Sequence, residues 1–215
     1  MKQKKKADTS EQAPQRLIAS AIDEIERHGL GQLTVRNVAA AAGVNIAAVN
    51  YYFRSKETLV AAALEGSVRN MLEDTDAFLT RMPDDPQAVL TELLASYLEG
   101  ALRYPRLARA LLHDAFTIDD YRGPFPVLFK PALQRLCDAV RAAVPSLDER
   151  GAAQRVVAAV SAMLFPGYFA GLYAPLGALD SEAERQRYAA QVARQALAPL
   201  EEDGSASRAP RTKRR

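Results

Sequence analysis

The sequence contains no tryptophan, one cysteine and two histidines among its 215 residues. A single cysteine excludes an intrachain disulfide, and the helical apolar spacing around Cys137 favours a small core residue over a redox-sensing thiol. His28 and His113 lie far apart, with no cysteine at the spacing that a metal site requires. We therefore expect neither a metal nor another cofactor.

Long apolar runs are also missing. No segment approaches the roughly 18 consecutive apolar residues of a membrane helix. The lysine-rich start, MKQKKKADTSEQ, has no apolar run behind it and so differs from a secretory signal. These absences predict a cytoplasmic protein without a membrane partner. The polar ends, residues 1–13 and 201–215, cannot bury enough surface to offset the entropy of ordering, and we expect both to be disordered.

Charge is unevenly distributed along the chain. Residues 1–60 contain 9 Lys and Arg against 6 Asp and Glu, a net charge of +3, whereas residues 61–200 contain 14 against 17, a net charge of −3. An anionic partner is therefore expected at the N-terminal part of the chain.

Helical periodicity dominates the rest of the sequence. Between about 14 and 28 the apolar residues recur at 3.6-residue spacing, and no stretch shows the sustained alternation of a β-strand. Thr34, Asn45 and Ser55 each precede a further helical pattern and are predicted N-caps. We predict an all-α protein with a compact domain over residues 14–60. The larger domain, residues 61–200, is predicted to contain helices at about 86–104, 105–116, 124–143, 149–174 and 181–200.

Two short predicted helices meet at Gly43 in a helix-turn-helix pattern, in which the second helix enters the major groove of DNA. Val49 would face the supporting core, and Ile46 would be partly exposed. Asparagine suits adenine, alanine methyls suit thymine, and tyrosine and lysine suit phosphates. The alternative is an ordinary helical bundle with residues 51–53 in its core. The predicted DNA-contacting residues are Thr34, Arg36, Asn45, Ala47, Ala48, Asn50, Tyr51, Tyr52 and Lys56.

Residues 16–59 resemble the N-terminal domain of TetR-family transcriptional regulators. The resemblance rests on the order T-V-x-x-V-A-x-x-A-G-V followed by Y-F-x-S-K-E-x-L. It implies a homodimer in which a small DNA-binding domain is joined to a larger helical domain that binds a small-molecule effector. It also implies a repressor that ligand releases from a palindromic operator. Asn50 departs from the tyrosine of many members, and we expect Asn50 with Ala47 and Ala48 to favour A·T base pairs.

Small residues occur on several faces of the last two predicted long helices, 149–174 and 181–200. Such helices can approach closely, so they are predicted to form a dimer interface, as the resemblance also implies; packing within one chain is the alternative. Aromatic residues of the larger domain are candidate ligand contacts, with ordinary core packing as the alternative. The predicted ligand-binding residues are Tyr97, Phe116, Phe125, Phe129, Phe165 and Phe169.

Two further features of the larger domain bear on a ligand site. Pro166 and Gly167 interrupt a long predicted helix, and the proline removes a backbone hydrogen bond and should kink it beside flanking aromatic residues. Arg103, Arg106 and Arg109, spaced by three, lie along one helical side. They either meet an anionic ligand or form a solvated face.

Catalytic constellations are absent from the sequence, which shows neither a nucleophile–base–orienter set nor a Gly-rich phosphate loop. The acidic pair at 119–120, near 113–114, lacks regular metal-ligand spacing. We therefore expect no enzyme. The alternative to a DNA-binding regulator is a helical ligand carrier or interaction module without a specific DNA target.

Overall fold

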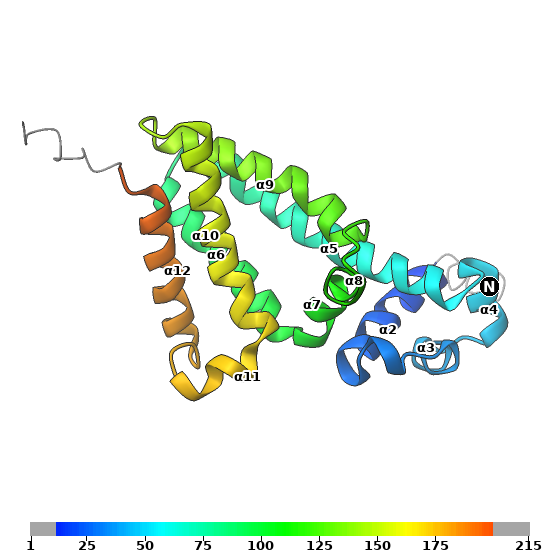
Figure 1. The fold of residues 1–215 in the computed structure, drawn as a ribbon. Coiled ribbons are helices and arrows are strands. Elements are labelled where there is room, and N and C mark those ends of the chain that lie inside the picture. Colours follow the sequence, from blue (N-terminus) through cyan, green and yellow to red (C-terminus); the bar gives the residue numbers. More distant parts are fainter. Residues whose placement is uncertain (1–11, 200–215) are drawn as a thin grey trace, which may run out of the picture.

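Helices make up all of the regular structure in residues 12–199, the part of the chain that the computed structural model describes (Figure 1). No strand occurs within these residues, which confirms the predicted all-α class. Residues 1–11 and 200–215 lie outside the described residues, and with them almost all of the two predicted tails.

The molecule is elongated, with α4 at one end and α12 at the other (Figure 1). The N-terminal elements are α2 (Ala13–His28), the 3-10 helix η1 (Leu30–Gln32), α3 (Val35–Ala42), α4 (Ile46–Phe53) and α5 (Lys56–Arg81). The remaining elements are α6 (Pro86–Arg103), α7 (Pro105–Leu111), α8 (His113–Ile118), α9 (Pro124–Ala143), α10 (Glu149–Tyr168), α11 (Ala170–Tyr173), the 3-10 helix η2 (Ala174–Leu176) and α12 (Glu182–Leu197).

Local side-chain bonds start the N-terminal helices where the sequence predicts them. Thr34, Asn45 and Ser55 each accept a hydrogen bond from the backbone N–H three residues ahead, at 3.1, 2.8 and 3.1 Å. Each bond satisfies a donor that the first helical turn leaves without a partner. Gly43 ends α3 in the left-handed conformation, at φ 66° and ψ 35°, which glycine adopts without steric cost.

Two separate hydrophobic clusters divide the molecule. The first cluster, which we call the head, contains α2, α3, α4 and the start of α5 as far as Leu64, and it also receives Leu107 and Ala110 from α7. The second, which we call the body, begins at Val68 and contains side chains from α6, α9, α10 and α12. Because α5 runs without interruption past residue 60, the predicted domain boundary falls inside a helix that belongs to both clusters.

The body is built around α6. This helix packs against α10 on one side and α12 on another, while α5 packs along α9 (Figure 1). Gly167 of α10 allows a close approach to α6, because a Cβ at this position would lie 2.1 Å from the Cβ of Ala101.

Two predicted long helices are divided in the structure. The predicted helix at 105–116 ends at Leu111, and α8 begins two residues later. The predicted helix at 149–174 ends at Tyr168, where the chain bends by 92° into the segment Ala170–Leu176. No single helix within residues 12–199 is long and apolar enough to cross a membrane, and this bent pair passes that test only when its two parts are joined.

Pro166 explains why α10 weakens near this bend. Proline has no N–H, so the carbonyl of Ala162, four residues earlier, loses its helical donor. The hydroxyl of Tyr188 on α12 donates to that carbonyl instead, at 3.2 Å. The helix continues two residues beyond the proline and ends at Tyr168, just before the 92° bend.

Candidate functional site

The helix α4 presents one face to the head and the other to solvent. Val49 is 1% exposed and Phe53 is also buried in the head cluster, whereas Tyr51 is 80% exposed. Ile46 is 43% exposed, in agreement with its predicted intermediate position. The rings of Tyr51 and Tyr52 meet edge to face at 5.0 Å, with Tyr52 packed against the head. Of residues 51–53, only the phenylalanine is therefore a full core residue.

The structure places most of the nine predicted DNA-contacting residues at the surface of the head. Those that are exposed are Thr34, Arg36, Asn45, Ala47, Asn50 and Tyr51. Those that are half-buried are Ala48, Tyr52 and Lys56. Ala48 was expected to face fully outward, but it is half-buried.

Arg54 is an exposed basic residue at the end of α4 that the sequence did not single out. Its backbone has φ 62° and ψ −37°, a conformation that costs a non-glycine residue about 1–3 kcal/mol. The residue connects α4 directly to Ser55, which caps α5. Only the basic step from Arg54 to Lys56 marks this position in the sequence, because the strained turn depends on how the two helices pack.

The described part of the head is nearly neutral. Residues 12–60 contain five basic side chains and four acidic ones, which leaves a net charge of +1. Most of the positive charge of residues 1–60 is therefore supplied by the lysines within residues 2–6, outside the described part of the chain.

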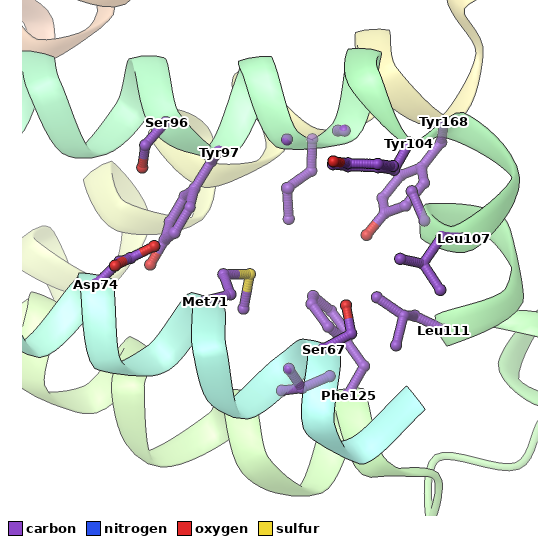
Figure 2. A pocket seen from close by; sticks show the side chains of 15 residues that line it. Ser67, Met71, Asp74, Ser96, Tyr97, Tyr104, Leu107, Leu111, Phe125 and Tyr168 are labelled. Carbon is purple, nitrogen blue, oxygen red and sulfur yellow. The ribbon is translucent and has the colours of Figure 1, made fainter. Parts of the chain in front are cut away.

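A partly open cavity of about 240 Å³ lies between the helices of the body (Figure 2). Side chains from α5, α6, α7, α9 and α10 line it. Of the predicted ligand-binding residues, Tyr97 and Phe125 line this cavity. Phe129 lies behind them in the core, with its ring stacked on that of Phe125 at 4.8 Å.

The other three predicted ligand-binding residues lie outside this cavity, but Phe116 and Phe169 line a second pocket of about 250 Å³ together with Tyr168. Phe116, Phe165 and Phe169 are 64%, 46% and 39% exposed, and their rings contact one another on the surface. The bend after α10 is the physical reason, because it ends the helix that was expected to hold Phe165 and Phe169 against the core. Tyr168, between them in sequence, is the residue of this segment that lines the cavity.

Two tyrosines of the cavity differ in their hydrogen bonds. The hydroxyl of Thr75 donates to the carbonyl of Met71 at 2.8 Å, so the Tyr97 hydroxyl, 2.9 Å from Thr75, is the donor to it. The hydroxyl of Tyr168 points into the cavity (Figure 2) and has no hydrogen-bond partner within residues 12–199. Burial raises the pKa of both tyrosines to about 12, so both are neutral phenols near neutral pH.

None of the three arginines spaced along α6 and α7 lines the cavity. The guanidinium of Arg103 lies 5.4 Å from the centre of the Tyr104 ring, and Arg109 donates to the Tyr168 carbonyl at 3.3 Å. Arg106 reaches the head. Arg106 and Arg109 instead line a separate, more open pocket of about 320 Å³ beside His113, so contact with an anionic ligand outside the cavity stays a prediction.

The head and body are joined by a reciprocal pair of helix caps. The Glu26 carboxylate at the end of α2 accepts from the backbone N–H groups of Arg106 and Leu107, at 3.1 and 2.9 Å. The Arg106 guanidinium in turn donates to the carbonyls of Glu26, at 3.4 Å, and Arg27. Each helix end thereby receives charge opposite to its dipole. Since Leu107 also lines the cavity, α7 contacts both the cavity and the head.

The small residues of α10 and α12 serve two purposes. Packing within the chain accounts for Ala159 on α10 and for buried alanines such as Ala193 on α12. A different stripe of α10 is exposed and contains Val157, at 64%, with Ala158 and Ser161. This stripe has no partner within residues 12–199.

The acidic residues near His113 do not gather into a metal site. Asp120 pairs with Arg122 at 2.8 Å, and this hydrogen-bonded partner lowers the pKa of Asp120 to about 2. Within residues 12–199 no group of three or more His, Cys, Asp or Glu side chains is arranged to hold a metal ion.

An exposed second helix of a helix-turn-helix, joined to a helical body that encloses a cavity, defines a DNA-binding transcriptional regulator with a ligand-binding domain. The family of bacterial regulatory proteins, tetR family, matches residues 17–63. The chain is a TetR-family transcriptional regulator.

Relatives match the chain over segments of different length. The HTH-type transcriptional dual regulator CecR of Shigella flexneri is 47% identical over 55 residues, which span 26% of this chain and 24% of that protein. The HTH-type transcriptional regulator BetI of Pseudomonas fluorescens is 28% identical over 171 residues, 73% of this chain and 82% of that one. A TetR transcription regulator from Haloarcula marismortui shares the fold with a TM-score of 0.60 at 22% identity, covering 89% of this chain and 97% of that one.

Proposed function

We propose that this chain is a homodimeric repressor that binds a palindromic operator and is released when a small molecule occupies the cavity of the body. The proposal rests above all on α4, whose buried residues Val49 and Phe53 fix the helix while Asn50 and Tyr51 remain exposed. A repressor of this kind acts in the cytoplasm, where its DNA is.

In the proposed complex, α4 lies in the major groove. Asn50 reads adenine through paired hydrogen bonds, and Ala47 contacts a thymine methyl group. Thr34 and Lys56, at the starts of α3 and α5, bind phosphates on the two sides of the groove, together with Tyr51. The remaining predicted contacts, Arg36, Asn45, Ala48 and Tyr52, flank these on the same surface. Arg54 is added to the phosphate contacts because its strained backbone holds it exposed beside Lys56.

The second subunit is proposed to pack on α10 and α12. One short helix reads few base pairs, whereas two heads related by a two-fold axis reach successive major grooves roughly 34 Å apart. The exposed stripe of Val157, Ala158 and Ser161 is apolar or small, which suits close packing against its own copy.

The cavity is proposed to communicate with the head through α7. A ligand that moves Leu107 also moves the N-terminus of α7, to which the Glu26 carboxylate is bonded. The spacing of the two heads would then change, provided that the ligand binds the DNA-competent and DNA-incompetent arrangements with different affinity.

Selection of bound duplexes from a random pool tests the proposal. The wild-type protein should enrich a palindrome with A·T pairs in each half-site, and log K should fall linearly with log salt. Asn50→Ala should lose preference at one or two positions per half-site, a change of about 1–3 kcal/mol in discrimination. Asn70→Ala, an exposed asparagine of α5 distant from α4, is the matched control and should select the wild-type sequence.

The outcomes separate the two candidate functions. Sequence enrichment that is identical for wild type and Asn50→Ala would exclude base reading by Asn50. A dimer that enriches no duplex at low salt would instead favour the ligand carrier or interaction module.

A further inference from the structure

The lining of the cavity has charge of only one sign. Asp74 on α5 is its one acidic side chain, and no lysine, arginine or histidine is among the lining residues. Asp74 has no ion pair within residues 12–199, although neighbouring carboxylates such as Asp76 do. Asp74 is itself an exposed residue, so it stays hydrated and charged, and a negatively charged ligand beside it would meet repulsion without any compensating cation.

Four aromatic side chains line the cavity, among mostly aliphatic and small ones. Tyr97 lies with Asp74 at one end, and Tyr104 and Tyr168 lie at the other, with Phe125 between them (Figure 2). The faces of aromatic rings attract organic cations, and a carboxylate beside them adds a charged hydrogen-bond acceptor. These features favour a ligand with a positive charge and an apolar or aromatic framework.

The two ends of the cavity are not equivalent. A cation is already present at the Tyr104 end, where the Arg103 guanidinium lies 5.4 Å from the ring centre. The ammonium group of a ligand is therefore favoured at the Asp74 end. The Tyr168 hydroxyl has no partner within the described residues and is available to a polar atom at the opposite end.

The size of the cavity limits the ligand. Its 240 Å³ corresponds to roughly eight water molecules at about 30 Å³ each, which is below the usual range for drug-sized ligands. A molecule of roughly ten non-hydrogen atoms fits this volume.

We propose that the effector is a compact organic ammonium ion with an aromatic body, whose cationic group pairs with Asp74 and whose far end bonds to the Tyr168 hydroxyl. The inference rests on the proposed function, since it takes this cavity as the effector site. It makes Asp74 and Tyr168 specificity-determining residues.

Calorimetric titration of the full-length protein with three matched probes tests the charge. Tyramine carries the ammonium group, 4-propylphenol replaces that group with a methyl, and 3-(4-hydroxyphenyl)propanoate carries a carboxylate. Tyramine should bind at least tenfold more tightly than 4-propylphenol, and the carboxylate should bind most weakly. Equal or tighter binding of 4-propylphenol or the carboxylate, or no binding of tyramine up to millimolar concentration, would overturn the proposal.

Two variants assign the contacts. Asp74→Asn should remove the preference for tyramine and leave the affinity for 4-propylphenol unchanged, whereas Glu73→Gln, the adjacent exposed carboxylate outside the lining, should retain the preference. Tyr168→Phe should weaken the binding of tyramine severalfold. It should leave the affinity for phenethylamine unchanged, because phenethylamine lacks the phenolic hydroxyl. A preference that survives in Asp74→Asn would contradict the pairing.

Operator binding is measured separately on the same preparations. If the protein enriches a duplex but does not prefer tyramine, the proposed regulatory function stands and only the proposed ligand class is refuted. If the protein prefers tyramine but enriches no duplex, the proposed ligand class stands and the proposed regulatory function is refuted.

Discussion

The head and the body are both built from helices, but they differ in how those helices are held and in what surface they form. In the head, short helices are fixed by local caps at Thr34, Asn45 and Ser55, and a small cluster holds one helix with its outer face free. In the body, longer helices enclose a space whose lining comes from five separate elements. A DNA surface can thus be specified over a few dozen consecutive residues, whereas a ligand cavity depends on contacts between distant parts of the chain. The family model matches residues 17–63, which lie within the head, in agreement with this difference.

The largest expected effect concerns the part of the body that we propose links two heads. Val157→Glu places a charge in the exposed stripe of α10, so we expect a monomer and an operator affinity reduced by at least about 100-fold through loss of avidity. Light scattering and fluorescence anisotropy measure the two quantities. Val127→Glu, at a 54% exposed position of α9, is the control and should remain dimeric. A dimeric Val157→Glu protein would place the interface elsewhere.

The second prediction concerns packing within the body alone. Gly167→Ala introduces a Cβ 2.1 Å from that of Ala101, so α10 and α6 must separate. We expect a loss of about 3 kcal/mol in the free energy of unfolding, the upper part of the usual range for overpacking. Urea denaturation measures this loss. Gly171→Ala, where a Cβ meets nothing within 4 Å, should change stability by less than about 0.5 kcal/mol.

The third prediction uses the buried tyrosines, which line the body and have no counterpart in the head. Tyr97 and Tyr168 have pKa values of about 12 when folded, against about 10 when unfolded. Between pH 10 and 12 the unfolded chain releases protons that the folded chain retains, so stability is full below pH 10 and falls through this window.

Each tyrosine should contribute a loss on the order of 1 kcal/mol per pH unit in this window. Tyr168→Phe should make the decline of stability with pH shallower, because it removes one of the two titrating groups. Denaturation at several pH values measures the slope. The same slope in the variant as in the wild type would show that the hydroxyl of Tyr168 is not shielded from water.

The smallest expected effect concerns the connection between the two parts. Glu26→Gln keeps the shape of the cap on α7 but removes its negative charge, at an expected cost of about 1 kcal/mol. Hydrogen exchange should show weaker protection of the Arg106 and Leu107 amides, with the core of the body unchanged. Asp23→Asn, exposed on the same helix, is the control. Unchanged protection of both amides would mean that Glu26 does not hold α7 to the head.

Local chemistry explains which parts of this structure could be predicted from the sequence. The caps at Thr34, Asn45 and Ser55 act over three residues, so each is visible in a short window of sequence. The inward position of Val49 follows from the same helical spacing. The outward position of Tyr51, which is 80% exposed, follows in the same way, because Tyr51 lies roughly 200° around the helix from Val49. The burial of Phe53 required the structure, since the alternative of a core formed by residues 51–53 was open from the sequence.

The residues that line the cavity could be predicted only in part from the sequence. Tyr97 and Phe125 were identified as aromatic residues of the body, but so were Phe116 and Phe169, and composition does not distinguish those that line the cavity from those at the surface. Asp74 gave no signal, because one carboxylate on a helix resembles any solvated acid. Its place in the cavity is set by the rotation of α5 against α6 and α9.

The continuity of α5 has a mechanical consequence. Its 26 residues make a rod about 39 Å long at 1.5 Å per residue, with its first turns in one cluster and the rest in the other. A tilt of about 5° around one end would displace the other by roughly 3 Å, comparable to the length of a hydrogen bond. Small adjustments at Ser67 or Asp74 would thereby be magnified at the start of α5, beside α4, the helix that we propose lies in the major groove.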